Sequence, residues 1–92
     1  NFPDFAEGWN KRATLFYLVG NTDASIEDIK KTLELEPRHF GALSGLGLVY
    51  LQQGKLALAE DAFGQIIAIH PNNTAAQENL RRVRLQRNQN VI

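Results

Sequence analysis

The chain has two histidines, His39 and His70, and an imidazole can act as a general base or as a metal ligand. The two residues are 31 positions apart, and neither has a histidine or a carboxylate nearby at a metal-binding spacing. We therefore interpret both as helix-end residues, with His39 at the start of one helix and His70 at the end of another. At the second position a cationic imidazole interacts favourably with the helix dipole.

Nucleophilic catalysis and phosphate binding have no better support in the sequence. Ser25 and Ser44 have no histidine at a suggestive local spacing, and no nucleophile motif surrounds them. The "GLG" run at residues 45–47 lies inside a helical pattern and lacks the lysine that follows a phosphate-binding loop. The chain has no cysteine, which excludes thiol catalysis, disulfides and cysteine-rich zinc sites. We therefore predict no catalytic residue, no cofactor and no metal, and the protein is not expected to be an enzyme.

The sharpest charge feature is the run "RRVRLQR", which contains four arginines and no acidic residue: Arg81, Arg82, Arg84 and Arg87. One interpretation is a solvated end helix whose basic residues complement the helix dipole. The other is a patch for an anionic partner, and the first is favoured. Across the whole chain ten basic and ten acidic residues cancel, so we expect neither nucleic acid nor a membrane among its partners.

Composition and length indicate a small folded domain. The chain has 92 residues, of which 43% are hydrophobic, so it is long enough for one core and too apolar for a disordered segment. No apolar run approaches the roughly 20 residues of a membrane span, and no signal peptide is visible. The chain begins with Asn1, which fits a processed protein or a fragment. The compartment is left open by these observations.

The sequence also predicts a series of helices that recur with a fixed period. Pro37 and Pro71 are 34 residues apart, and so are Gly20 and Gly54. A fixed period of this length indicates a repeat architecture. Apolar spacing, glycines suited to helix ends and helix-stopping prolines predict five helices and no strands. The expected helices cover residues 4–19, 24–35, 39–53, 56–69 and 74–87.

This arrangement resembles the tetratricopeptide repeat family. A 34-residue unit of this family consists of two helices, A and B, joined by a turn. Helix A has a large residue near its start and an aromatic residue near its end, small residues lie where the two helices cross, and a proline closes the unit. The first unit supplies Trp9, Ala13, Phe16, Ser25, Ile29 and Pro37, and the second Leu43, Leu46, Gly47, Tyr50, Ala59, Phe63 and Pro71. The resemblance covers residues 6–73, with departures at Arg12, Thr32 and Ile66.

The resemblance implies an all-α solenoid with a right-handed superhelical stack. Repeat one is expected at residues 6–39, repeat two at 40–73, a capping helix at 74–88 and a frayed tail at 89–92. Eight residues are expected to be buried: Trp9, Ala13, Phe16, Leu43, Gly47, Tyr50, Ala59 and Phe63. Three glycines fall inside one helix, although each costs about 1 kcal/mol relative to alanine. Gly47 is explained by a close crossing with Ala59, whereas Gly41 and Gly45 are not.

The resemblance also implies a protein-interaction module whose A helices line a concave face for a peptide or a partner domain. The wheel of each A helix places a second stripe of residues on that face. With the corresponding positions of the last helix, the candidate surface comprises Glu7, Asn10, Thr14, Tyr17, Gly41, Ser44, Leu48, Leu51, Gln52, Glu78 and Arg82. The shallow centre at Gly41 and Ser44 is interpreted either as room for a ligand or as space that neighbouring helices need.

Two further expectations concern partners. Some members of the family grip a C-terminal carboxylate with lysine, asparagine and arginine. The matching positions here hold Asn10, Thr14, Gly45, Ala75 and Asn79, so that clamp is not predicted. The alternative function is a structural segment of a longer repeat protein that self-associates. Phe2 and Phe5 have no assigned partner in the repeats, so we expect an interface at the N-terminal end.

Overall fold

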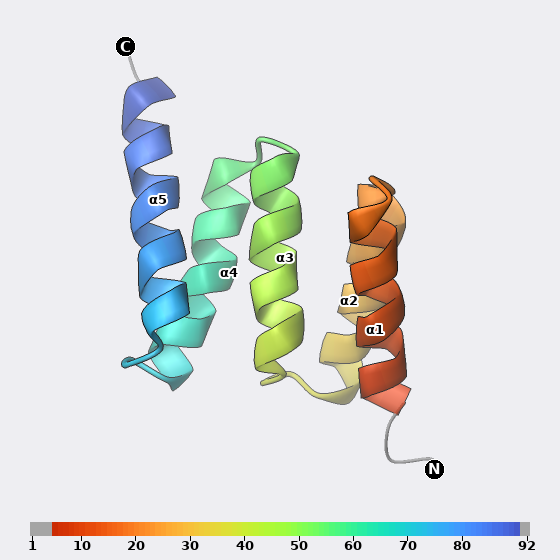
Figure 1. Ribbon diagram of the computed structural model, residues 1–92. Helices are drawn as coiled ribbons and strands as arrows, with labels where there is room; N and C mark the ends of the chain where they lie inside the picture. The colour runs from red at the N-terminus through yellow and green to blue at the C-terminus, as the bar shows by residue number, and fades with distance from the viewer. Residues whose placement is uncertain (1–4, 91–92) are drawn as a thin grey trace.

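The computed structural model describes residues 5–90. The described chain contains five α-helices and no strand: α1 (Phe5–Leu18), α2 (Thr22–Leu35), α3 (Phe40–Gln52), α4 (Leu56–Ile69) and α5 (Thr74–Asn90). Figure 1 shows α1, α3 and α5 nearer the viewer, with α2 and α4 behind them. The molecule is elongated, at 50 × 29 × 17 Å, as expected for stacked repeats. The prediction of an all-α repeat solenoid is confirmed.

The helix ends follow from local chemistry. Gly20 and Gly54 close α1 and α3 with φ values of +84° and +77°, a left-handed conformation that glycine adopts without steric cost. The Asn21 side chain accepts a hydrogen bond from the Ala24 amide and caps α2. The predicted helix ends agree with the observed ones to within two residues, except at the end of α5. That helix continues to Asn90, so residues 89 and 90, predicted to be frayed, are helical.

Each helix packs against its neighbours in the chain. α1 contacts α2, α3 contacts α4 and α4 contacts α5, while α2 contacts α3 across the boundary between the repeats. Two apolar clusters result. One joins α3, α4 and α5 around Phe63 and Val83, and the other joins α1, α2 and α3 around Ile29 and Val49. All four of these side chains are essentially inaccessible to solvent.

Gly47 allows the close crossing of α3 and α4. A Cβ placed on Gly47 would lie 2.5 Å from Cζ of Phe63, closer than carbon atoms can approach. Phe63 is fully buried and so is Ala59, so neither the ring nor the opposing helix has room to shift. The predicted role of Gly47 is therefore confirmed: the conformational cost of this glycine is offset by contact with the Phe63 ring.

Polar groups hold α1 against α2. Arg12 Nε donates to Asp28 Oδ2 at 2.7 Å and Arg12 Nη2 donates to Asp28 Oδ1 at 3.0 Å, which is a bidentate pair. The Asp28 side chain is 3% exposed and the Arg12 side chain 56% exposed. This hydrogen bonding raises the pKa of the Arg12 guanidinium, although partial burial opposes the rise. Ser25 Oγ donates to the Ala13 carbonyl at 2.7 Å, and Thr32 Oγ1 donates to the Asp28 carbonyl at 2.9 Å.

Three of the eight residues predicted to be buried are only half-buried: Trp9, Phe16 and Tyr50. Trp9 and Phe16 lie along the side of α1 that carries Arg12, whose guanidinium carbon is 5.0 Å from the Trp9 ring centre and 5.5 Å from that of Phe16. Lys31 Nζ lies 4.3 Å from the Trp9 ring centre. The prediction was wrong for Trp9 and Phe16 because long cationic side chains, not a neighbouring apolar helix, lie over their rings. Tyr50 packs against both apolar clusters but is not fully enclosed by them.

Candidate functional site

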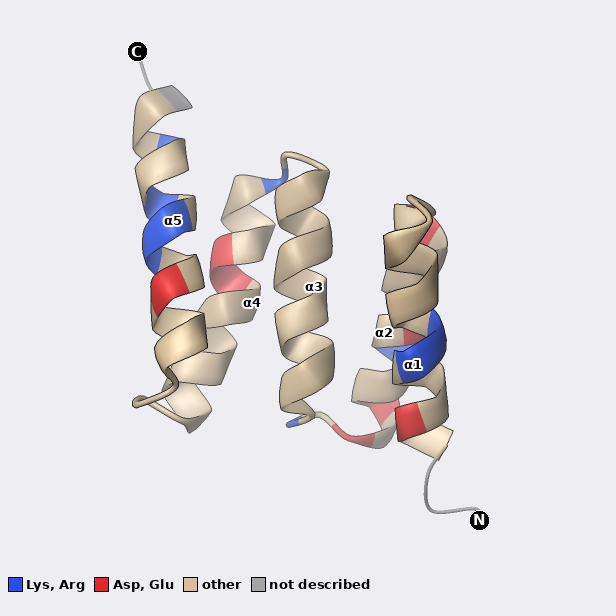
Figure 2. Cartoon of the chain, in the orientation of Figure 1, with Lys and Arg blue, Asp and Glu red and all other residues tan. Residues whose placement is uncertain are grey.

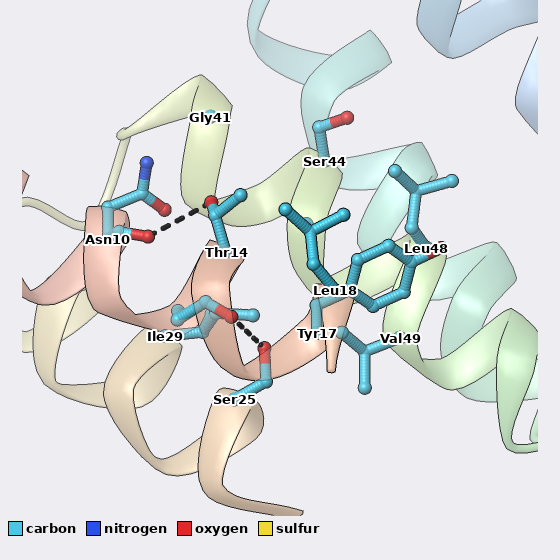
Figure 3. Close-up of a pocket in the computed structure, with 12 residues that line it drawn as sticks. Asn10, Thr14, Tyr17, Leu18, Ser25, Ile29, Gly41, Ser44, Leu48 and Val49 are labelled. Atoms are coloured by element: carbon cyan, nitrogen blue, oxygen red, sulfur yellow. Dashed lines mark hydrogen bonds between the residues drawn. The ribbon is translucent and has the colours of Figure 1, made fainter. Parts of the chain in front are cut away.

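A cavity of about 300 Å³ opens between α1 and α3. Its lining comes from three helices, with α2 supplying the base: Asn10, Ala13, Thr14, Tyr17, Leu18, Ser25, Ile29, Gly41, Ser44, Gly45, Leu48 and Val49. We call this site the α1–α3 groove. Figure 3 shows Asn10 and Thr14 of α1 on one side and Ser44 and Leu48 of α3 on the other, with Ser25 and Ile29 of α2 below Asn10 and Thr14.

About half of the residues predicted to form the binding surface line the groove. Six of the eleven candidate residues line it: Asn10, Thr14, Tyr17, Gly41, Ser44 and Leu48. The remaining candidates do not line this cavity: Glu7, Leu51, Gln52, Glu78 and Arg82. Phe2, one of the two residues assigned to an N-terminal interface, lies outside the described residues, and Phe5 is exposed at the start of α1. The groove is therefore shorter than the predicted stripe and is confined to repeat one and the first half of repeat two.

Polar groups in the groove fall into two kinds. The hydroxyls of Thr14 and Ser25 are already paired, since Thr14 Oγ1 donates to the Asn10 carbonyl at 3.1 Å and Ser25 Oγ donates to the Ala13 carbonyl. The side chains of Asn10 and Ser44 are half-buried and make no hydrogen bond within residues 5–90. An amide offers both donors and an acceptor, and a hydroxyl offers one of each. These two side chains are therefore available to a ligand.

His39 fixes one end of the groove. Its Nδ1 accepts a hydrogen bond from the Ala42 amide and caps α3, while its Nε2 lies 3.0 Å from Glu7 Oε1. This arrangement joins the beginnings of α1 and α3 and occupies the Glu7 carboxylate. His70 caps the C-terminal end of α4, and its ring lies 5.9 Å from that of Phe40 in an edge-on arrangement. The helix-end interpretation of both histidines is confirmed.

The groove contains two of the three glycines of α3. A Cβ on Gly41 would lie 3.1 Å from His39 Cε1 and 3.3 Å from Asn10 Nδ2, which is tight. A Cβ on Gly45 would lie 3.6 Å from Ile29 Cδ1, which is ordinary contact. Packing therefore forbids a side chain at position 47 but not at position 45.

The groove carries no charged residue. Figure 2 shows α3 without a single charged position, between charged segments of α1 and α5. In the basic run, Arg84 and Arg87 both pair with Glu60, and Arg81 pairs with Glu78 at 2.9 Å. The hydrogen bond from Arg84, together with Arg87, holds the pKa of Glu60 below its ordinary value, although partial burial works against this. Three of the four arginines thus have carboxylate partners within the domain, which favours the solvated end helix over an anion-binding patch.

Several residues of the groove were not predicted from the sequence: Ala13, Leu18, Ser25, Ile29, Gly45 and Val49. Ser25 and Ile29 belong to α2, and they reach the groove only because α2 packs behind the gap between α1 and α3. The four-residue spacing of Gly41 and Gly45 was the one available signal, since it places both glycines on one side of the helix.

Within the described helices none is both long and apolar enough to cross a membrane. Residues 5–90 also lack any cluster of three or more histidine and acidic side chains that could hold a metal ion.

A family model described as tetratricopeptide repeat matches residues 10–74, which is more than half of the chain. The chain belongs to the tetratricopeptide repeat family. The match begins at Asn10, inside α1, and ends at Thr74, the first residue of α5. The resemblance inferred from the residue pattern is therefore confirmed, and the domain is a protein-interaction module rather than an enzyme.

Relatives share this segment but are longer. The chain is 45% identical over 76 residues to a TPR repeat-containing protein of Rhizobium etli, covering 83% of this chain and 37% of the relative. It is 33% identical over 76 residues to DnaJ homolog subfamily C member 3 of Bos taurus, covering 83% of this chain and 15% of that protein. The chain thus spans little more than a third of the first relative and less than a sixth of the second.

Solved structures share the fold at low sequence identity. The first TPR of Spaghetti (RPAP3) bound to the HSP90 peptide SRMEEVD has a TM-score of 0.85 and 20% identity, covering 92% of this chain and 68% of that chain. The first TPR domain of human RPAP3, determined by NMR, has a TM-score of 0.52 and 17% identity, covering 98% of this chain and 99% of that chain.

Proposed function

We propose that this domain is a scaffold that binds an extended segment of a partner protein in the α1–α3 groove. The observation that carries the proposal is the gathering of Asn10, Thr14, Tyr17, Gly41, Ser44 and Leu48 around one cavity. A volume of about 300 Å³ is at the small end for ligand sites, so it fits a few side chains rather than a folded domain.

The chemistry of the groove suits an extended peptide. A peptide backbone brings N–H and C=O groups that need hydrogen-bond partners when water is removed. The Asn10 amide and the Ser44 hydroxyl can supply such partners, and Leu48 and Tyr17 can contact side chains of the ligand. The peptide in the solved Spaghetti (RPAP3) structure supports a peptide partner in general terms.

A peptide array tests this proposal. Purified domain is applied to immobilised random ten-residue peptides, and the captured sequences are resynthesised and titrated. We expect Leu48→Glu and Tyr17→Ala to weaken binding at least tenfold while the helical circular dichroism signal is retained. Lys30→Ala is the control, because Lys30 is exposed on α2 and does not line the groove. Equal losses from both sets of variants, or capture of no peptide, would contradict the proposal.

We also propose self-association through the N-terminal end of the solenoid as a second function. Leu15 of α1 is 62% exposed. The equivalent residue 34 positions later, Val49 of α3, is only 1% exposed because it packs against α1 and α2. The residue at this position is therefore exposed in repeat one, whereas in repeat two it makes a contact between the repeats. A second copy that meets this side of α1 would bury Leu15 together with the half-buried rings of Trp9 and Phe16.

Sedimentation velocity over a wide concentration range tests self-association. The wild-type domain is expected to form dimers that Leu15→Ser, or Phe2→Ser with Phe5→Ser, disrupts. Leu58→Ser is the matched control, since Leu58 is an exposed leucine of α4. A wild-type protein that stays monomeric at the highest concentration would rule out this second function.

A further inference from the structure

The α1–α3 groove has a distinctive electrostatic character for a site between two helices of a domain that is 22% charged. Helix α3 contains no charged residue over its whole length, Phe40–Gln52. Opposite it, α1 presents the neutral side chains of Asn10, Thr14 and Tyr17. Glu7, the acidic residue of α1 in the predicted surface, lies with its Oε1 3.0 Å from His39 Nε2 and is thus paired. A charged ligand group that entered the groove would lose hydration and gain no opposite charge.

The groove is deep at Gly45 because a glycine has no side chain. Gly45 has room for a Cβ at ordinary contact distance from Ile29, so packing of the domain does not require a glycine there. Glycine destabilises a helix interior relative to alanine. Because Gly45 has no side chain, its half-buried backbone and the half-buried Leu48 border the groove, above the buried side chains of Ile29 and Val49. At Gly47 the Phe63 ring excludes any side chain, but no neighbouring residue excludes one at Gly45. The glycine at position 45 is therefore better explained by room for a ligand than by helix packing.

We propose that the occupant of the groove is an uncharged extended segment that inserts one apolar side chain against Gly45, and that carboxylate-rich segments are rejected. This inference rests on the proposed peptide-binding function and names the ligand class. Asn10 and Ser44 hydrogen-bond to the backbone on either side of the inserted side chain. Leu48 and the backbone of Gly45 contact the side chain itself.

A pair of glycine variants tests the position of the inserted side chain. Gly45→Ala places a methyl group in the groove, and Gly64→Ala places one on α4, where nothing lies within 4 Å. Both substitutions raise helix propensity, so both are expected to raise the thermal midpoint. Only Gly45→Ala is expected to weaken binding, by about 5–10-fold, because the methyl group occupies ligand space. Equal affinity of the two variants would overturn the proposed insertion at Gly45.

A set of capped heptapeptides tests the charge rule. The probes are Ac-SSNLSNS-NH2, the same peptide with glutamate in place of leucine, the same peptide with alanine in place of leucine, and SRMEEVD. Binding is measured by backbone amide shifts of the labelled domain. The leucine peptide is expected to bind at least tenfold more tightly than each of the other three, with shifts at Asn10, Ser44 and Gly45.

A cation introduced into the groove should reduce the preference for the leucine peptide over the acidic peptides. Thr14→Lys adds a cation at an exposed position of the lining and is expected to raise the affinity for the glutamate peptide and for SRMEEVD at least fivefold. Binding of SRMEEVD to the wild-type domain as tightly as the leucine peptide would overturn the charge rule while leaving peptide binding intact. No shifts with any of the four probes, or with array-selected peptides, would instead defeat the proposed function itself.

Discussion

The two repeats bury equivalent positions of their second helices with different chemistry. In repeat one, α2 presents three buried polar residues to α1: Ser25, Asp28 and Thr32. The positions 34 residues later in α4 are all apolar and equally buried: Ala59, Ala62 and Ile66. The first hairpin is joined by hydrogen bonds and a bidentate ion pair, and the second by contact between Phe63 and the bare backbone of Gly47.

The repeat pattern thus constrains how the two helices pack, but not whether polar or apolar contacts hold them together. Arg12 stands where repeat two has Leu46, and Asp28 stands where it has Ala62. Asp28 alone would be a buried carboxylate without an ion-pair partner, whereas the Arg12 side chain is 56% exposed and would stay hydrated. Together they form a pair in which the buried carboxylate receives two hydrogen bonds. A buried pair is not inherently better than an apolar contact, since its desolvation offsets much of its attraction.

The largest expected effect comes from separating the pair. Arg12→Leu copies the residue of repeat two but leaves the Asp28 carboxylate buried without its ion-pair partner, which is expected to lower the unfolding free energy more than the other substitutions below. Arg12→Leu with Asp28→Ala copies both residues of repeat two and is expected to recover most of that loss. Urea unfolding followed by circular dichroism measures both. If the single variant were as stable as the wild type, the buried pair would not hold the first hairpin.

The second prediction concerns the apolar contact where α3 and α4 cross in repeat two. Gly47→Ala forces a Cβ against the Phe63 ring and is expected to cost about 1–3 kcal/mol, against a gain in helix propensity of about 1 kcal/mol. Adding Phe63→Ile, the residue type that repeat one has at position 29, should relieve the clash. A double-mutant cycle in urea measures the coupling of the two positions. Additive effects would mean that the ring does not limit position 47.

A smaller effect is expected for the buried hydroxyl of repeat one. Ser25→Ala removes the hydrogen bond from Ser25 Oγ to the Ala13 carbonyl and should cost about 1 kcal/mol. Its counterpart in repeat two is Ala59, so Ala59→Ser is the reciprocal variant. Thermal unfolding of both variants is the measurement. Destabilisation by Ala59→Ser and not by Ser25→Ala would show that the hydroxyl of Ser25 contributes nothing.

The smallest effect concerns ion pairs at the surface of repeat two. Because Arg84 and Arg87 lower the pKa of Glu60 in the folded state, their stabilisation is present at neutral pH and is lost as pH falls through that lowered value. The loss begins near the ordinary glutamate pKa of about 4.3. Glu60→Gln should flatten this part of the stability profile and lower the thermal midpoint by less than Ser25→Ala, because such pairs are weak and screened by salt. An identical pH profile for the variant and the wild type would contradict the assignment.

Much of the fold could be predicted because its signals are local or periodic. The helix ends at Gly20 and Gly54 depend on the conformational freedom of one residue, and the 34-residue period gives the pairing of helices. Gly47 could be explained from the sequence for the same reason, since a small residue at that register implies a close crossing. The groove was partly predictable: the stripe of α1 and α3 was found, but its extension to Leu51, Gln52 and α5 is not part of the cavity.

The helices, their order, the repeat and the neutral character of α3 follow from the amino-acid sequence, because each depends on residue type and spacing along one segment. Which polar residues are partners, and where the cavity opens, depends on how the helices pack in three dimensions. Arg12 meets Asp28 and Ile29 reaches the groove between α1 and α3 because helices distant in sequence pack at a particular depth and angle. That packing is fixed by steric fit between whole helix surfaces, such as Phe63 against Gly47, and no single segment carries the information.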